Sequence, residues 1–173
     1  MIAQRFAAGV EYDGSDFHGW QVQSHARSIQ STLNAAISTV ANEILTTAAA
    51  GRTDTGVHAC GQVVHFDSVA RRSEFAWLRG INSHLPADIA IQWVRAVPPD
   101  FHARYSALAR SYRYVILNRP VRSALDRHRA WQLRVPIDAT LMQFAARHLI
   151  GEHDFSSFRA AGCQSKNPVR RIE

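Results

Sequence analysis

Gly51-Arg52-Thr53-Asp54-Thr55-Gly56-Val57-His58 lies between two apolar runs, Ile44–Ala50 and Gln62–Phe66. Both runs have the length and composition of short buried strands, so the stretch is predicted to be the loop that joins them. Its two glycines permit positive φ or the close approach of another segment, and a guanidinium and a carboxylate lie between them. Such a loop suits a rigidly held catalytic group, but it also suits a simple turn in which Asp54 caps a local hydrogen-bond network.

The surrounding residues predict a β-α-β-β-α-β unit. Residues 2–12 alternate apolar and polar positions as a strand does, and Ile89–Val97 is a further strand. Ser28 and Ser73 are each placed to cap a helix, and Pro86 ends the second helix. The expected inward faces are Ile29, Leu33, Ile37 and Val40 in the first helix and Phe75, Leu78, Ile81 and Leu85 in the second. The predicted fold is therefore α+β and ferredoxin-like (RRM-like), an antiparallel sheet with two helices on one face, spanning residues 1–103.

Residues 104–173 predict a second domain of similar type that is incomplete. Ser111–Asn118 has the composition of a strand, and Arg119–Arg134 that of a long arginine-rich loop. A helix is expected to start at Pro136 or Asp138 and to end at Gly151, with Leu141, Phe144, Ala145 and Leu149 on one face. A last strand opens near Val169. This order lacks the partners that would complete a sheet, so the second domain is expected to be incomplete.

Charge is distributed unevenly along the chain. The net charge is +6, but residues 1–70 contain three basic and six acidic side chains, which gives −3 and leaves +9 for the remainder. Eight arginines and a single acid, Asp126, lie between Arg104 and Arg134. Arginine forks match phosphate oxygens, so this region predicts a phosphate-binding surface. An arginine-rich genome would explain the preference for arginine over lysine, but not the asymmetry.

Several classes of protein are disfavoured by the sequence. No apolar run approaches the roughly 18–20 residues of a membrane-spanning helix, and no signal peptide is recognisable. Cys60 and Cys163 form no Cys-x-x-Cys pair, and two buried reduced thiols are expected, as in a cytoplasmic protein. Neither His-Glu-x-x-His nor the Cys-x-x-Cys of the zinc base deaminases is present, so no metal site is expected.

The motifs together resemble the tRNA pseudouridine synthase A family. Gly-Arg-Thr-Asp-x-Gly-Val-His matches the signature of that family, and the agreement continues in order over nearly the whole chain. The other matching stretches are Tyr12–Ser15, Phe17–Gln21, Gly61–Phe66, Phe101–Arg104, Tyr112–Tyr114 and Gly151–Phe158.

The resemblance implies isomerisation of uridine to pseudouridine in the anticodon stem-loop of tRNA. It makes Asp54 the catalytic nucleophile, while attack at the sugar C1′ and attack at the base C6 both remain open. Arg52 would assist base flipping or contact phosphate, and Tyr112 would stack on the uracil. The resemblance implies no metal or organic cofactor, and a homodimer for the full-length protein. It also implies that this chain is truncated at its C-terminal end, within the second domain. Arginines expected to hold RNA phosphates are Arg104, Arg113, Arg119 and Arg122.

Other functions fit parts of the same pattern. A non-catalytic RNA-binding module of the RRM type has the same topology, but the aromatic Lys/Arg-Gly-Phe/Tyr-Gly/Ala-Phe-Val motif of such modules is absent. A glycosidase would need a second carboxylate on a facing element, and none stands out. A remnant that keeps the fold without activity is a third reading. Tyr114 is better explained as a core aromatic than as a site residue.

Overall fold

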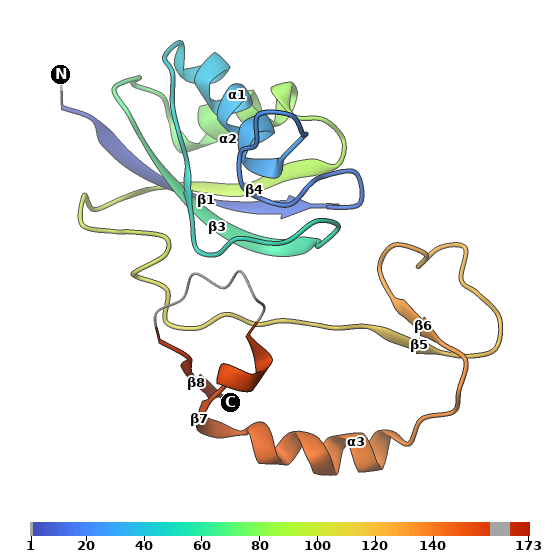
Figure 1. Cartoon of the computed structure of the whole chain (residues 1–173). Coiled ribbons are helices and arrows are strands. Elements are labelled where there is room, and N and C mark those ends of the chain that lie inside the picture. The colour runs from blue at the N-terminus through green and yellow to red at the C-terminus, as the bar shows by residue number, and fades with distance from the viewer. Residues whose placement is uncertain (1, 160–166) are drawn as a thin grey trace. The chain divides into compact units, whose positions relative to one another are not determined.

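The structure, a computed structural model, describes residues 2–159 and 167–173 (Figure 1). The chain forms two compact units, residues 1–115 and 116–173. Mixed helices and strands with antiparallel pairing confirm the α+β class. The domain boundary expected after residue 103 stays a prediction.

Four strands and two helices make up the first unit (Figure 1). The strands are β1 (Gln4–Tyr12), β2 (Ala48–Ala49), β3 (Ala59–Ser68) and β4 (Ile89–Val97), and the helices are α1 (Ile29–Ala41) and α2 (Glu74–His84). The sheet has the order β2-β3-β1-β4, and every neighbouring pair is antiparallel. β1 is therefore hydrogen-bonded along both edges and forms the centre of the sheet.

The core lies between the sheet and the two helices. Phe6, Ala8, Val10 and Tyr12 alternate along β1 and are buried, as the sequence pattern predicts. Phe6, Phe66 and Trp77 form an aromatic cluster with ring centroids 5.3–5.6 Å apart. This cluster fixes α2 to the middle of the sheet.

Both predicted helix caps are confirmed. The Ser28 hydroxyl accepts from the Ser31 N–H at 3.2 Å, and the Ser73 hydroxyl accepts from the Ala76 N–H at 3.1 Å. Phe75, however, is 69% exposed, so its predicted inward position is wrong. Ile81 is buried as predicted. Trp77, four residues before it, is buried in place of Phe75, which lies two positions earlier and therefore on another side of the helix.

The opposite face of the sheet is covered by the chain that follows β4. The Ala103 N–H donates to Nδ1 of buried His65 at 3.2 Å, and the His65 and His102 rings lie 4.6 Å apart. Arg5 holds the start of this segment through the Pro99 and Phe101 carbonyls, at 2.6 and 2.9 Å. The segment is thereby anchored to the strands before it reaches residues 104–115.

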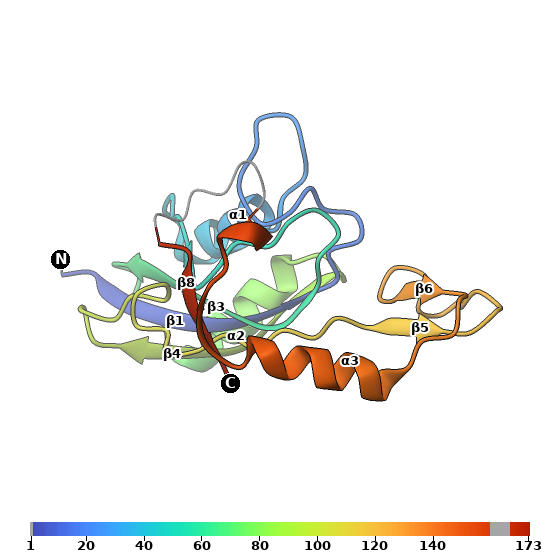
Figure 2. The ribbon, with the colours of Figure 1, turned by 60° about the horizontal axis from the view of Figure 1, so that its bottom comes forward.

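In the described part of the second unit, residues 116–159 and 167–173, the chain forms two strand pairs and one α-helix (Figures 1 and 2). β5 (Ile116–Asn118) pairs in parallel with β6 (Trp131–Leu133), and β7 (Gly151–Asp154) pairs antiparallel with β8 (Val169–Ile172). Between them lie α3 (Ala139–Ala146), capped by Asp138 as predicted, and the 3-10 helix η1 (Arg147–Leu149). A second 3-10 helix, η2 (Ser156–Phe158), follows β7.

Several predictions for strands and burial are wrong in detail. The expected strand Ser111–Asn118 is paired only over Ile116–Asn118, and β6 lies within the region predicted to be loop. The predicted helix is present as α3, and Leu141 and Phe144 on its apolar face are 66% and 64% exposed. Cys60 is exposed rather than buried, and Cys163 lies outside the described residues.

Candidate functional site

The Asp54 loop, residues 51–58, connects β2 to β3 as the sequence predicts. The Val57 N–H donates to the Asp54 carbonyl at 3.2 Å, which closes a tight turn, and Gly56 has a φ of 77°. Asp54 is exposed, and no side chain of the described residues forms a hydrogen bond or ion pair with its carboxylate. Arg52 is exposed on the same loop two residues earlier. The carboxylate is therefore accessible while its backbone is held.

Buried aromatic residues hold the loop from one side. The Tyr12 hydroxyl lies 2.8 Å from Thr53 Oγ1, and the Trp20 N–H donates to the Thr53 carbonyl at 2.9 Å. Burial raises the pKa of Tyr12, so its hydroxyl stays protonated. The Gly56 N–H adds a bond to the Phe17 carbonyl at 3.3 Å. These contacts fix the backbone at Thr53 and Gly56, one residue before and two residues after the catalytic candidate Asp54.

A close backbone approach joins the turn at residues 13–16 to the end of the Asp54 loop. A Cβ added at Gly14 would lie 2.1 Å from the Val57 carbonyl oxygen, so only glycine fits. The Gly14 N–H donates to His58 Nδ1 at 3.1 Å. His58 Nδ1 also lies 3.1 Å from Asp13 Oδ1. The loop thus has a second polar anchor beyond its tight turn.

The strand side of the loop is held by Gln62 and Arg110. Gln62 Nε2 donates to the Gly51 carbonyl at 2.6 Å, and the Ala50 N–H donates to the Val63 carbonyl at 2.8 Å. Arg110 donates to the Ala50 carbonyl through Nε and Nη2, at 3.2 and 2.7 Å. None of these contacts was predicted, although the matching motifs contain Gln62, Tyr12 and Gly14.

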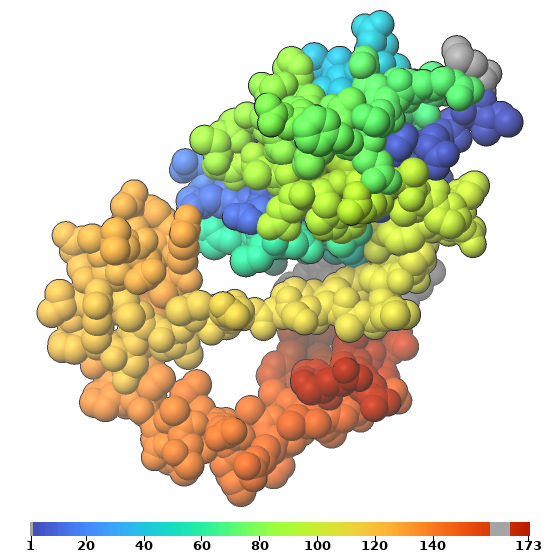
Figure 3. All heavy atoms as spheres, turned by 180° about the vertical axis from the view of Figure 1, so that it is seen from behind, coloured from blue at the N-terminus to red at the C-terminus, as the bar shows by residue number. Residues whose placement is uncertain are grey.

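The other predicted site residues lie on exposed chain. Tyr112 is 87% exposed in an unpaired segment rather than in the predicted strand, and Tyr114, expected in the core, is 77% exposed. Arg104 and Arg113 are exposed in the first unit, in the segment whose atoms are yellow in Figure 3. Arg119 and Arg122 are exposed in the second unit. The structure brings Arg52 and Asp54 together on one loop and leaves the four phosphate-binding candidates accessible.

His65 and Asp67 lie on β3, next to the chain that follows β4 on the face of the sheet opposite the helices. Burial lowers the pKa of His65, and the nearby His102 and Arg5 lower it further. The two bonds from the Arg5 guanidinium, both 2.7 Å, hold the pKa of Asp67 below its usual value. The histidine is thus neutral and accepts from the backbone, whereas the aspartate is ionised and paired.

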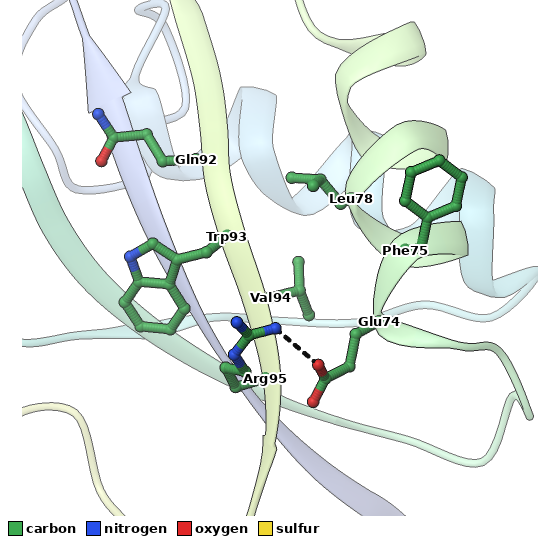
Figure 4. Close-up of a pocket in the computed structure, with 7 residues that line it drawn as sticks. All are labelled: Glu74, Phe75, Leu78, Gln92, Trp93, Val94 and Arg95. Atoms are coloured by element: carbon green, nitrogen blue, oxygen red, sulfur yellow. Dashed lines mark hydrogen bonds and ion pairs between the residues drawn. The ribbon is translucent and has the colours of Figure 1, made fainter.

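A hollow of about 290 Å³ lies between α2 and β4, away from the Asp54 loop (Figure 4). Glu74 is its one acid: the Ala96 N–H and the Arg95 guanidinium each donate to it at 2.8 Å, and together they lower its pKa. A carboxylate held ionised in this way is a poor proton donor. The lining residues, Glu74, Phe75, Leu78, Gln92, Trp93, Val94 and Arg95, include none from the Asp54 loop.

Neither a metal cluster nor a membrane-spanning helix occurs in the described part of the chain. Among residues 2–159 and 167–173, no group of three or more His, Cys, Asp or Glu side chains is placed to share a metal ion. Within the same residues, every helix is too short or too polar to cross a bilayer.

Comparison with known proteins gives consistent matches. A family model described as tRNA pseudouridine synthase matches residues 8–106 and 145–173. The chain is similar to proteins named tRNA pseudouridine synthase A: 54% identical to one from Coxiella burnetii over 169 residues, 97% of this chain and 64% of that protein. It is also 54% identical to one from Klebsiella pneumoniae and 52% identical to one from Escherichia coli, covering 97% of this chain and 62% of each relative. The chain thus spans less than two thirds of the length of these relatives.

Proposed function

Because the chain belongs to the tRNA pseudouridine synthase family, we propose that the protein isomerises uridine to pseudouridine in the anticodon stem-loop of tRNA. The observation that carries the proposal is the exposed Asp54 carboxylate on a loop held by its backbone from three sides. Such a group is accessible to a bulky substrate and already positioned before the substrate binds.

The chemistry needs one nucleophile and balanced proton movements. The N1–C1′ bond breaks, a C5–C1′ bond forms, N1 gains a proton and C5 loses one, so no oxidant or reductant is consumed. Asp54 holds the reacting nucleotide covalently while the base turns, and attack at C1′ and attack at C6 both use this carboxylate. Arg52, two residues away, supplies positive charge and assists base flipping, which costs a few kcal/mol.

Tyr112 and the arginines supply the binding surface. Tyr112 is 87% exposed, and its ring can stack on the extruded uracil. Arg104, Arg113, Arg119 and Arg122 are exposed and contact phosphates, which position the stem-loop without reading its sequence. The reaction uses no metal or organic cofactor, and the full-length protein acts as a homodimer in the cytoplasm, as the family resemblance implies.

We assign the first unit to the ferredoxin-like arrangement. The assignment is supported by the element order β-α-β-β-α-β and by the antiparallel sheet order β2-β3-β1-β4. The Asp54 loop then joins β2 to the neighbouring strand β3 at one end of the sheet. We assign the second unit to a second domain.

The test is release of tritium from tRNA labelled at uridine C5, measured for the full-length protein in the presence of EDTA. Asp54→Asn keeps the shape of the side chain and removes its charge, and it should abolish release while tRNA binding persists. Asp100→Asn is the matched control, because Asp100 is an exposed carboxylate in the turn after β4. A rate for Asp54→Asn within about tenfold of wild type would refute nucleophilic catalysis, which contributes far more than this factor. If the wild-type protein binds tRNA but forms no pseudouridine, the result would favour the alternative, a non-catalytic RNA-binding module of the RRM type.

A further inference from the structure

Arg110 joins two segments that are far apart in the sequence. Its Nε and Nη2 donate to the Ala50 carbonyl at 3.2 and 2.7 Å, and Nη2 also donates to the Arg104 carbonyl at 3.2 Å. A guanidinium can reach two carbonyls at once because its donors form a planar fork. Lysine has the same charge but no such fork.

The first of the two segments that Arg110 joins is the start of the Asp54 loop. Ala50 immediately precedes Gly51, and it is fixed to β3 by its bond to the Val63 carbonyl. Gly51 is held in turn by Gln62, and a Cβ added at Gly51 would lie 3.6 Å from Arg110 Nε. Arg110 therefore packs directly against the first residue of the loop.

The second segment that Arg110 joins is residues 104–112, which lead to Tyr112. Ala103 is 3% exposed and bonded to His65, so the Arg104 carbonyl follows a residue anchored on the sheet. Beyond Arg110, residues 111–115 are exposed and pair with no strand among the described residues. Arg110 thus fixes the chain two residues before Tyr112.

We propose that Arg110 is a positioning residue for the isomerisation: its guanidinium holds the Tyr112 segment against the entry of the Asp54 loop. This inference rests on the proposed function, because the isomerisation is the reason for holding these two segments together. The role differs from that of the phosphate-binding arginines. Arg110 acts by directing donors to backbone carbonyls, so its geometry matters more than its charge.

Two substitutions separate geometry from charge. Arg110→Ala and Arg110→Lys should each lower kcat by up to about 100-fold, because displacements near 1 Å have effects of that size. The Kd for tRNA and its salt dependence should stay near wild type in both variants. Arg79→Ala on α2 removes the same charge from an exposed position and should leave kcat unchanged.

A phosphate contact at Arg110 gives a different pattern and would overturn the proposal. In that case Arg110→Lys would keep wild-type activity, whereas Arg110→Ala would weaken tRNA binding and reduce the log–log salt slope of the tRNA affinity by about one. A wild-type kcat in either variant would also overturn it.

A distance measurement tests the bridge independently of turnover. Spin labels at Thr55→Cys and Ser111→Cys, in a Cys60→Ser and Cys163→Ser background, report the separation of the loop and the Tyr112 segment. Their distance distribution should be narrow with Arg110 and broad in both variants, even if the wild type forms no pseudouridine and the proposed function fails. An unchanged distribution would show that Arg110 does not hold the segment, whatever the activity.

Discussion

Gly14→Ala should displace the Asp54 loop without touching a catalytic group. Gly14 is buried, and an added Cβ would lie 2.1 Å from the Val57 carbonyl oxygen and 2.7 Å from its carbon. Both atoms are backbone, so no side-chain rotation can relieve the clash. Since the Val57 N–H closes the turn onto the Asp54 carbonyl, movement of Val57 carries Asp54 with it.

The size of the effect follows from this distance. Real Cβ atoms stay at least 3.0 Å from such neighbours, so one of the two backbones must retreat by about 0.9 Å. Overpacking of this kind costs about 1–3 kcal/mol of stability. A displacement near 1 Å at a reacting group costs up to about 100-fold in rate. We therefore expect kcat to fall much more than the fraction of folded protein.

The assay compares Gly14→Ala with Gly61→Ala in tritium release and in urea denaturation. A Cβ at Gly61 meets nothing within 4 Å, so this control should be neutral or more stable by about 0.5–1 kcal/mol. Binding of tRNA should be similar in both variants. If Gly14→Ala keeps the kcat of the control, the turn at residues 13–16 does not position Asp54, and the reasoning from close approach is wrong.

Three further predictions concern pH, salt and the Tyr112 hydroxyl. The pKa of His65 is lowered from 6.5 in the folded chain, so as the pH falls the unfolded chain takes up this proton before the folded chain does. The free energy of unfolding, measured by urea titration, should therefore fall as the pH drops from about 8 to 5. His65→Gln should make the free energy of unfolding less dependent on pH. Combined replacement of Arg119, Arg122 and Arg127 by Ala should reduce the log–log salt slope of tRNA affinity by about two, and an unchanged slope would place the RNA elsewhere. We expect the Tyr112 hydroxyl to help move the proton from uracil C5, so Tyr112→Phe should keep tRNA affinity but lose about 100-fold in kcat; a full rate would exclude proton transfer by the hydroxyl.

Elements that depend on local chemistry were predicted well from the sequence. Ser28 and Ser73 cap the helices where expected, and β4 has the predicted bounds, Ile89–Val97. A cap involves residues three apart, and a helix face repeats every three or four residues, so both can be read in a short window. The same holds for the Asp54 loop, whose glycines mark its turn.

Elements that depend on a distant partner were predicted less well. Ile44 is 96% exposed, and β2 is limited to Ala48–Ala49, because only those residues find a register on β3. The composition of residues 111–115 favours a strand, but they have no strand partner within the described residues. Strand propensity measures how a residue packs on a sheet, so it does not decide whether a sheet is present.

The supports of the candidate site were missed for a related reason. Tyr12 and Thr53 are 41 residues apart, and Arg110 and Ala50 are 60 apart. No short-range period connects such pairs. The available signal was the pair of glycines in the early motifs, Gly14 and Gly19, because both lie where a Cβ would clash with the backbone of the Asp54 loop.

The Asp54 loop is held by buried aromatic side chains, whereas the Tyr112 segment is held by exposed polar contacts. Substitutions in the two places should therefore affect stability and activity differently. Under the Asp54 loop, Tyr12, Phe17 and Trp20 are 3%, 1% and 2% exposed, so the loop shares the core of the first unit. Each buried aromatic ring contributes substantially to folding, so changes here should lower stability and activity together. The Tyr112 segment is exposed and is held by polar contacts such as that of Arg110. Single exposed polar contacts contribute little to stability, so changes there should lower activity while the free energy of unfolding stays near that of the wild type.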